Sequence, residues 1–143
     1  MKMKTEKIKQ LIGKAAEARK YSYAPYSDFK VGAALLTSDD EIIKGCNIES
    51  ASYGATNCAE RTAIFKAVSE GKKSFKAIAI MGGKEDEDST STYAYPCGIC
   101  RQVMREFCNP ESFIVIIAKS ADEYEEYLLK ELLPHGFGPE DLA

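Results

Sequence analysis

The 143 residues of this sequence contain one histidine, His135, so a site built from several imidazoles of one chain is excluded. Long apolar runs are also missing. Because the basic N-terminus has no hydrophobic segment behind it, we expect neither a signal peptide nor a membrane span, and we expect a cytoplasmic protein. The formal net charge of −3 suits a phosphate backbone poorly, so nucleic acid is not an expected partner.

The number of cysteines is odd, and with no secretion signal this argues against a disulfide framework. The five residues are Cys46, Cys58, Cys97, Cys100 and Cys108. Metal ligation or catalysis is the better explanation for some of them, whereas Cys46 and Cys108 are expected to be packed thiols. The chain length, with 45% hydrophobic and 29% charged residues, suits a single compact domain over residues 1–143.

Helical and strand patterns alternate along the chain. Apolar residues at helical spacing predict an amphipathic helix over 5–21, and Pro25 prevents its continuation. Further helices are expected at 57–70, with Thr56 or Asn57 as the N-cap, and at 97–107 and 122–133. Strands are expected at 29–36, 42–49, 75–81 and 113–118. The alternation predicts an α/β layered domain with about five strands.

Two cysteine motifs lie where helices are predicted to begin. In Pro96-Cys97-Gly98-Ile99-Cys100, the first turn of a helix can present both thiols to one tetrahedral metal ion, and the helix N-terminus favours the thiolate. Alone, this motif would also suit a redox pair or half of a zinc ribbon. Cys58-Ala59-Glu60 adds a third thiol, and three protein ligands leave the open position typical of catalytic zinc. Glu60 could then face a metal-bound water without ligating the metal.

Together, the two motifs resemble those of the zinc nucleoside and nucleobase deaminases, in the variant whose first ligand is cysteine. The resemblance to the small homotetrameric cytidine deaminases covers nearly the whole chain. The further matching segments are residues 29–34 (FKVGAA), 45–49 (GCNIE), 56–63 (TNCAERTA), 100–102 (CRQ), 132–134 (LLP) and 137–139 (FGP). This resemblance implies a three-layer α/β/α fold with a mixed sheet, a homotetramer, and one zinc ion per chain on Cys58, Cys97 and Cys100.

The resemblance also implies a reaction: hydrolysis of cytidine and 2′-deoxycytidine to uridine and 2′-deoxyuridine with release of ammonia, a step of pyrimidine salvage. Zinc-bound hydroxide would attack C4 of the base, while Glu60 would carry a proton to N3 and then to the departing amino group. Three thiolates bring a charge of −3 against the +2 of zinc. Arg61 is therefore expected to donate hydrogen bonds to sulfur and restore the electrophilicity of the metal.

The same resemblance implies the substrate contacts. Asn47 and Glu49 lie two apart in a predicted strand and so share one face, where they would hydrogen-bond the ribose, chiefly its 3′-hydroxyl. A carboxylate there would disfavour a 5′-phosphate, which points to free nucleosides. Phe29 would lie against the base and the Ala59 backbone against its polar edge. Phe137, in a Pro/Gly-rich tail, would reach into the active site of a neighbouring chain.

Simpler explanations exist for each residue. The three cysteines could be packed thiols or a structural zinc site, Glu60 could complement a helix dipole, and Arg61 could lie on the surface. Phe29 and Phe137 could belong to the core of their own chain, and Asn47 and Glu49 could be an ordinary polar pair at a strand end. Two other functions also stay open: deamination of a modified cytosine nucleoside, such as an aminoacyl-nucleoside antibiotic, and a non-catalytic zinc-binding interaction module, which would need a fourth protein ligand.

Overall fold

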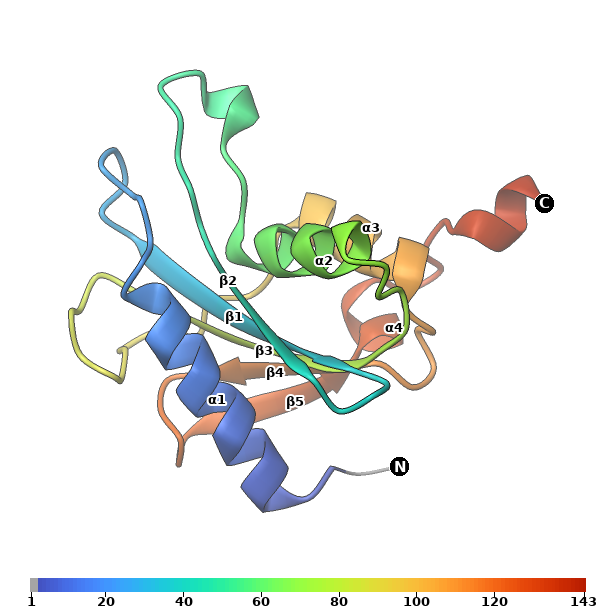
Figure 1. The fold of residues 1–143 in the computed structure, drawn as a ribbon, viewed down its shortest axis with the longest axis horizontal. Coiled ribbons are helices and arrows are strands. Elements are labelled where there is room, and N and C mark those ends of the chain that lie inside the picture. Colours follow the sequence, from blue (N-terminus) through green and yellow to red (C-terminus); the bar gives the residue numbers. More distant parts are fainter. Residues whose placement is uncertain (1–2) are drawn as a thin grey trace.

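A five-stranded mixed sheet forms the centre of the protein (Figure 1). This computed structural model describes residues 3–143; residues 1 and 2 of the predicted domain lie outside the described residues. The sheet has the order β2-β1-β3-β4-β5, in which only the β3–β4 pair is parallel. The strands are β1 (Lys30–Thr37), β2 (Ile42–Cys46), β3 (Phe75–Gly83), β4 (Ile114–Ala118) and β5 (Tyr124–Leu128).

Helices cover both faces of this sheet, which confirms the three-layer α/β/α architecture. One face carries α1 (Thr5–Arg19), and the other carries α2 (Ala59–Ser69) and α3 (Gly98–Phe107), as Figure 1 shows. A short helix, α4 (Leu129–Leu132), and two 3₁₀ turns, Tyr53–Ala55 and Pro139–Leu142, complete the chain. Within residues 3–143, no helix combines the length and apolar composition needed to cross a bilayer.

The central strands are apolar on both sides because each side meets a helix layer. In β1, Ala34 and Leu36 pack toward α1, whereas Ala33 and Leu35 pack toward α2. All four side chains are 2% exposed or less. Two separate hydrophobic clusters therefore hold the layers together.

The helix predicted over 122–133 is wrong: its first half is β5, and only Leu129–Leu132 is helical. Apolar residues at 124, 127 and 128 fit a helical face, but they also fit a strand that is half-buried on both sides. In the structure Tyr124 and Leu128 pack on the α1 side and Tyr127 on the α2 side. The segment forms a strand because β4 would otherwise have an unpaired edge. As β5, it pairs with β4 in an antiparallel ladder and satisfies the backbone N–H and C=O groups of that edge.

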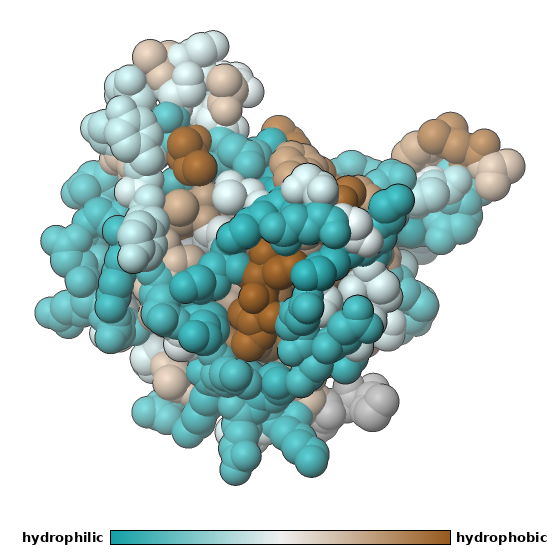
Figure 2. Space-filling model, viewed as in Figure 1, coloured by the Kyte–Doolittle hydropathy of each residue, from teal (hydrophilic) through white to brown (hydrophobic). Residues whose placement is uncertain are grey.

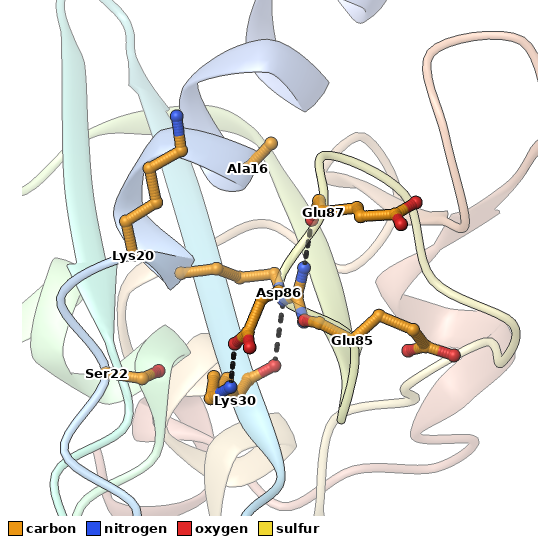
Figure 3. Close-up of a pocket in the computed structure, with 8 residues that line it drawn as sticks. Ala16, Lys20, Ser22, Lys30, Glu85, Asp86 and Glu87 are labelled. Carbon is orange, nitrogen blue, oxygen red and sulfur yellow. Dashed lines mark hydrogen bonds and ion pairs between the residues drawn. The ribbon is translucent and has the colours of Figure 1, made fainter.

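A buried arginine at the end of α1 fixes the loop that follows β3. Figure 3 shows this loop with Glu85, Asp86 and Glu87. Arg19 is 3% exposed. Its guanidinium donates hydrogen bonds to the carbonyls of Lys30 (3.0 Å), Gly83 (3.0 Å), Glu85 (2.6 Å) and Glu87 (2.9 Å). An ion pair between Lys30 and Asp86 lies beside it. The helix, the start of β1 and the loop after β3 are thereby tied together through one side chain.

Candidate active site

Three cysteine thiols converge where two helices begin. Cys58 is the N-cap of α2, Cys97 is the N-cap of α3, and Cys100 lies buried in the first turn of α3. The three Sγ atoms lie within 4.8 Å of one another, with 3.7 Å between those of Cys58 and Cys97. Tetrahedral zinc at about 2.3 Å from each sulfur would require sulfur separations of about 3.8 Å. The cluster therefore fits one zinc ion.

The predicted N-cap of the second helix is wrong, since neither Thr56 nor Asn57 caps it. The hydroxyl oxygen of Thr56 accepts the backbone N–H of Ser50 at 3.1 Å, and the amide of Asn57 donates to the Thr62 hydroxyl at 3.0 Å. Because both polar side chains bind elsewhere, Cys58 takes the cap position. Its sulfur consequently lies at the positive end of the helix dipole, which favours a thiolate.

Arg61 reaches this cluster from the next turn of α2. Its Nη2 donates to the Cys58 Sγ at 3.3 Å, while its buried Nε–H has no hydrogen-bond partner among the described residues. A hydrogen bond with the Cys100 thiol, helped by Arg61 and Cys97, lowers the pKa of Cys58 to about 5. The same bond and burial raise the pKa of Cys100. The hydrogen bond from Arg61 thus favours the thiolate form of Cys58.

Glu60 lies beside the thiols without joining them. The potential metal-binding cluster found in residues 3–143 consists of three cysteines, and the Glu60 side chain, 4% exposed, belongs to the adjoining wall. Burial raises the pKa of Glu60 to about 7, and the negative charge of Cys58 acts in the same direction. A carboxyl group with such a pKa can both accept and return a proton near neutral pH.

A pocket of about 300 Å³ opens in front of the cluster. Its wall contains six of the residues that the sequence singled out as well as five others. They are Phe29, Val31, Asn47, Thr56, Asn57, Cys58, Ala59, Glu60, Ala94, Tyr95 and Cys97. The volume lies at the lower end of the range for small-molecule sites, about 300–1,000 Å³.

The backbone of Gly82 in β3 lies directly behind two residues of the pocket wall, Phe29 and Ala94. A Cβ atom at Gly82 of β3 would lie 2.6 Å from the Cβ of Ala94 and 3.0 Å from Cε2 of Phe29. Real Cβ atoms essentially never approach so closely. Only glycine at this position lets Phe29 and Ala94 stand where they line the pocket.

The Asn47 amide is held in one orientation by the start of β1. Its Oδ1 accepts the N–H of Val31 at 2.9 Å and the hydroxyl of Ser22, and its Nδ2 donates to the carbonyl of Phe29 at 2.8 Å. An amide carries two N–H donors. Among residues 3–143, one acceptor is found for these donors, the carbonyl of Phe29, and Asn47 lines the pocket.

Comparisons with known proteins agree with this geometry. Residues 5–116 match the family model described as the cytidine and deoxycytidylate deaminase zinc-binding region. The chain belongs to the cytidine and deoxycytidylate deaminase family. The cytidine deaminase of Sporosarcina psychrophila is 48% identical over 136 residues, which are 95% of each chain. A second relative, from Halalkalibacterium halodurans, is also 48% identical, over 92% of this chain and 95% of its own.

A solved structure also resembles this deaminase. The crystal structure of cytidine deaminase from Burkholderia pseudomallei has a TM-score of 0.80 and 45% identity, and the match covers 90% of this chain and 97% of that one. The mixed five-stranded sheet and the sequence therefore lead to the same family.

Glu49 lies outside the 300 Å³ pocket that opens in front of the thiols. The strand predicted over 42–49 ends at Cys46, because the chain then passes between two loops, with Ile48 bridging to Tyr23 and Asn57. Glu49 instead lines a neighbouring pocket of about 350 Å³, together with Tyr26, Ser27, Tyr53 and Thr56. Since Thr56 lines both pockets, the two adjoin.

Phe137 lies away from the pocket of its own chain. Its side chain is 56% exposed, so it does not cap the core of its own chain, and its carbonyl accepts a hydrogen bond from the Gln102 side chain at 2.7 Å. The C-terminal segment projects from the body of the deaminase, and hydrophobic side chains gather at its tip (Figures 1 and 2). Leu142, in this segment, is 79% exposed.

Several pocket residues were not assigned from the sequence: Val31, Thr56, Asn57, Ala94 and Tyr95. Tyr95 donates from its hydroxyl to Glu125 of β5 at 2.5 Å. A signal existed for some of them, because Asn57 directly precedes one cysteine motif and Tyr95 directly precedes the other.

Proposed function

We propose that this chain is a zinc-dependent cytidine deaminase that hydrolyses cytidine and 2′-deoxycytidine to uridine and 2′-deoxyuridine with release of ammonia. The observation that carries the proposal is the position of Glu60, which is buried, separate from the thiols and part of the pocket wall. Relatives named cytidine deaminase, 48% identical over nearly the full chain, support the same reaction.

The proposed chemistry divides between metal and protein. Cys58, Cys97 and Cys100 would hold one zinc ion, which when bound supplies Lewis acidity and makes a water molecule acidic enough to ionise near neutral pH. Glu60 takes up one proton at its carboxylate and passes it to N3 of the base. It then takes up a second proton, from the hydroxyl group added at C4, and passes this one to the amino group, which leaves as ammonia. Arg61 draws negative charge away from the Cys58 sulfur through its hydrogen bond.

The two adjoining pockets suit the two halves of a nucleoside. In this proposal the pyrimidine enters the 300 Å³ pocket between Phe29 and the Ala59 backbone, and Asn47 offers its second N–H to the ribose. The sugar extends into the neighbouring 350 Å³ pocket, where Glu49 accepts a hydroxyl. A carboxylate at this place repels a 5′-phosphate, which favours free nucleosides over nucleotides.

We also propose that the protein is a homotetramer whose active sites are shared between chains. The exposed Phe137 supports this, as do Phe65 of α2 and Ile99 of α3, which are 47% and 62% exposed on the helices that carry the thiols. Light scattering after size exclusion tests the assembly, and a fully active monomer would contradict it. The cytoplasmic location stays a prediction, favoured because three metal-binding thiols require a reducing compartment.

The alternatives fit less well. A structural zinc module needs a fourth protein ligand, whereas the cluster found within residues 3–143 offers three. The second alternative is a deaminase that acts on a modified cytosine nucleoside, such as an aminoacyl-nucleoside antibiotic. Measuring ammonia release from that antibiotic and from cytidine side by side distinguishes it from a cytidine deaminase.

The deciding experiment is an ultraviolet assay of cytidine loss, with ammonia measured in parallel, before and after zinc removal. We expect turnover that disappears with the metal and returns when zinc is added back. A zinc-replete protein that leaves cytidine unchanged would overturn the proposed function.

A further inference from the structure

The hydroxyl of Ser27 connects two of the residues proposed to hold the substrate. It donates to Oε2 of Glu49 and accepts the backbone N–H of Phe29 at 3.0 Å. Phe29 belongs to the pocket for the base and Glu49 to the pocket beside it. One hydroxyl group thus fixes the position of a base-facing wall relative to a carboxylate that would meet the sugar.

The whole turn around Ser27 is organised on this carboxylate. Backbone N–H groups of Tyr26 and Ser27 donate to Oε1 of Glu49 at 2.9 and 3.2 Å. Asp28 has a φ of 57°, in the left-handed region, and its N–H closes the turn on the carbonyl of Ala24 at 3.0 Å. The donors of the turn, led by the Ser27 hydroxyl, hold the pKa of Glu49 below its usual value. Glu49 is therefore an ionised acceptor with a fixed direction.

Glu49 is not part of a strand. It lies beyond the end of β2, and its own N–H is bound to the carbonyl of Tyr23 at 2.8 Å. The backbone donors hold only Oε1, so the Ser27 hydroxyl is the group that fixes Oε2 and with it the rotation of the carboxylate plane.

We propose that Ser27 is a positioning residue that holds the Glu49 carboxylate in the orientation needed to accept the 3′-hydroxyl of a nucleoside. The inference rests on the proposed function, because it assumes that the sugar lies against Glu49. It adds a residue that itself touches no reacting atom but that sets how strongly the sugar is recognised.

Ser27→Ala removes the hydroxyl that donates to Oε2 of Glu49 and accepts the Phe29 N–H, and it leaves the two backbone donors to Oε1. Two inhibitors separate these losses, because a change at Phe29 would affect both of them equally, whereas a change at Glu49 would affect only the one with a 3′-hydroxyl. The readout is competitive inhibition by 2′-deoxyuridine and 2′,3′-dideoxyuridine, which differ only in the 3′-hydroxyl and are not consumed. We expect the inhibition constant of 2′-deoxyuridine to rise by about 10- to 100-fold, the order of one charge-assisted hydrogen bond. That of 2′,3′-dideoxyuridine should change by less than about twofold, and for cytidine the rise in KM should be larger than the fall in kcat.

Two further variants keep the result interpretable. Ser91→Ala removes the same kind of bond, a hydroxyl donating to Glu85 at 2.7 Å, away from both pockets, and should change neither constant. Ser27→Thr keeps the hydroxyl and should restore discrimination. If Ser27→Ala does not fold, Glu49→Gln and the Ser27→Thr variant still measure how far the 3′-hydroxyl is recognised through this pair.

The outcomes separate the two hypotheses. A wild-type protein that does not deaminate cytidine contradicts the proposed function. If the wild type deaminates cytidine but Ser27→Ala weakens both inhibitors equally, or neither of them, Ser27 does not act through the sugar hydroxyl and the inference is overturned.

Discussion

The Arg61 guanidinium donates a hydrogen bond to the Cys58 sulfur at 3.3 Å, one turn along α2. It places a positive charge against the sulfur ligands, whose three thiolate charges would exceed the +2 of a bound zinc ion. We predict that Arg61→Gln keeps the zinc but lowers kcat by about 10- to 100-fold, the usual cost of losing a group that supports a metal ligand. Cys58→His in that background removes one negative charge and should recover part of kcat. Equal activity of the double and single variants at equal zinc content would refute this charge balance.

Replacing Glu60 should separate metal binding from turnover. Glu60→Gln is nearly isosteric but cannot carry a proton, so we expect kcat to fall by about 100-fold or more. Zinc content by elemental analysis and the midpoint of thermal unfolding should stay close to the wild-type values. Appreciable turnover in a zinc-replete variant would mean that another group transfers the protons.

Zinc content should depend on the clustered cysteines and not on the other thiols. We expect one zinc per chain in the wild type and none after Cys97→Ala and Cys100→Ala together. Cys108→Ala is the matched control, because this thiol is 5% exposed but lies outside the cluster. Zinc retained by the double variant, or lost from the Cys108 variant, would contradict the assignment.

The exposed phenylalanine of the tail should matter for substrate binding. If Phe137 covers the base in a neighbouring chain, Phe137→Ala removes a stacking interaction of about 1–3 kcal/mol, or about 5- to 150-fold in affinity. The Kd of cytidine, measured in the Glu60→Gln background, should rise by that factor. Leu142→Ala, at a still more exposed position of the tail, serves as the control and should leave the Kd unchanged.

The buried Arg19 should contribute mainly to stability. Arg19→Met leaves four buried or partly buried carbonyls without their charged donor, and we expect the free energy of unfolding to fall by about 3 kcal/mol or more. Lys20→Met, next along the chain, removes an exposed ion pair with Asp88 and should change it by about 0.5 kcal/mol or less. Urea unfolding followed by circular dichroism compares the two; similar losses would show that Arg19 has no special role.

The thiol cluster could be predicted because its geometry is mostly local. Cys97 and Cys100 share one helix turn, and Cys58 needs only a second helix start beside it. The remaining pocket wall depends on long-range contacts that no local pattern contains. Ala94 reaches the pocket because Gly82 of another strand leaves room for it.

Two local patterns were also decided by neighbours distant in sequence. The segment around Tyr124 became a strand because β4 needed a partner for its edge. Glu49 lies beyond the end of its predicted strand because the chain after Cys46 bridges to two loops instead, through Ile48 to Tyr23 and Asn57. In both cases hydrogen-bonding groups from elsewhere in the fold overrode the periodicity of the segment itself.

Gly82 limits how this pocket can be redesigned. Because main chain, and not a side chain, lies behind Phe29 and Ala94, nothing can be trimmed at residue 82 to gain volume, and any larger residue would push both neighbours inward. Directed evolution toward bulkier bases would therefore have to change side chains of the wall itself, such as Phe29 or Ala94. Even the smallest substitution, Gly82→Ala, would narrow the pocket for the base without contacting the three thiols.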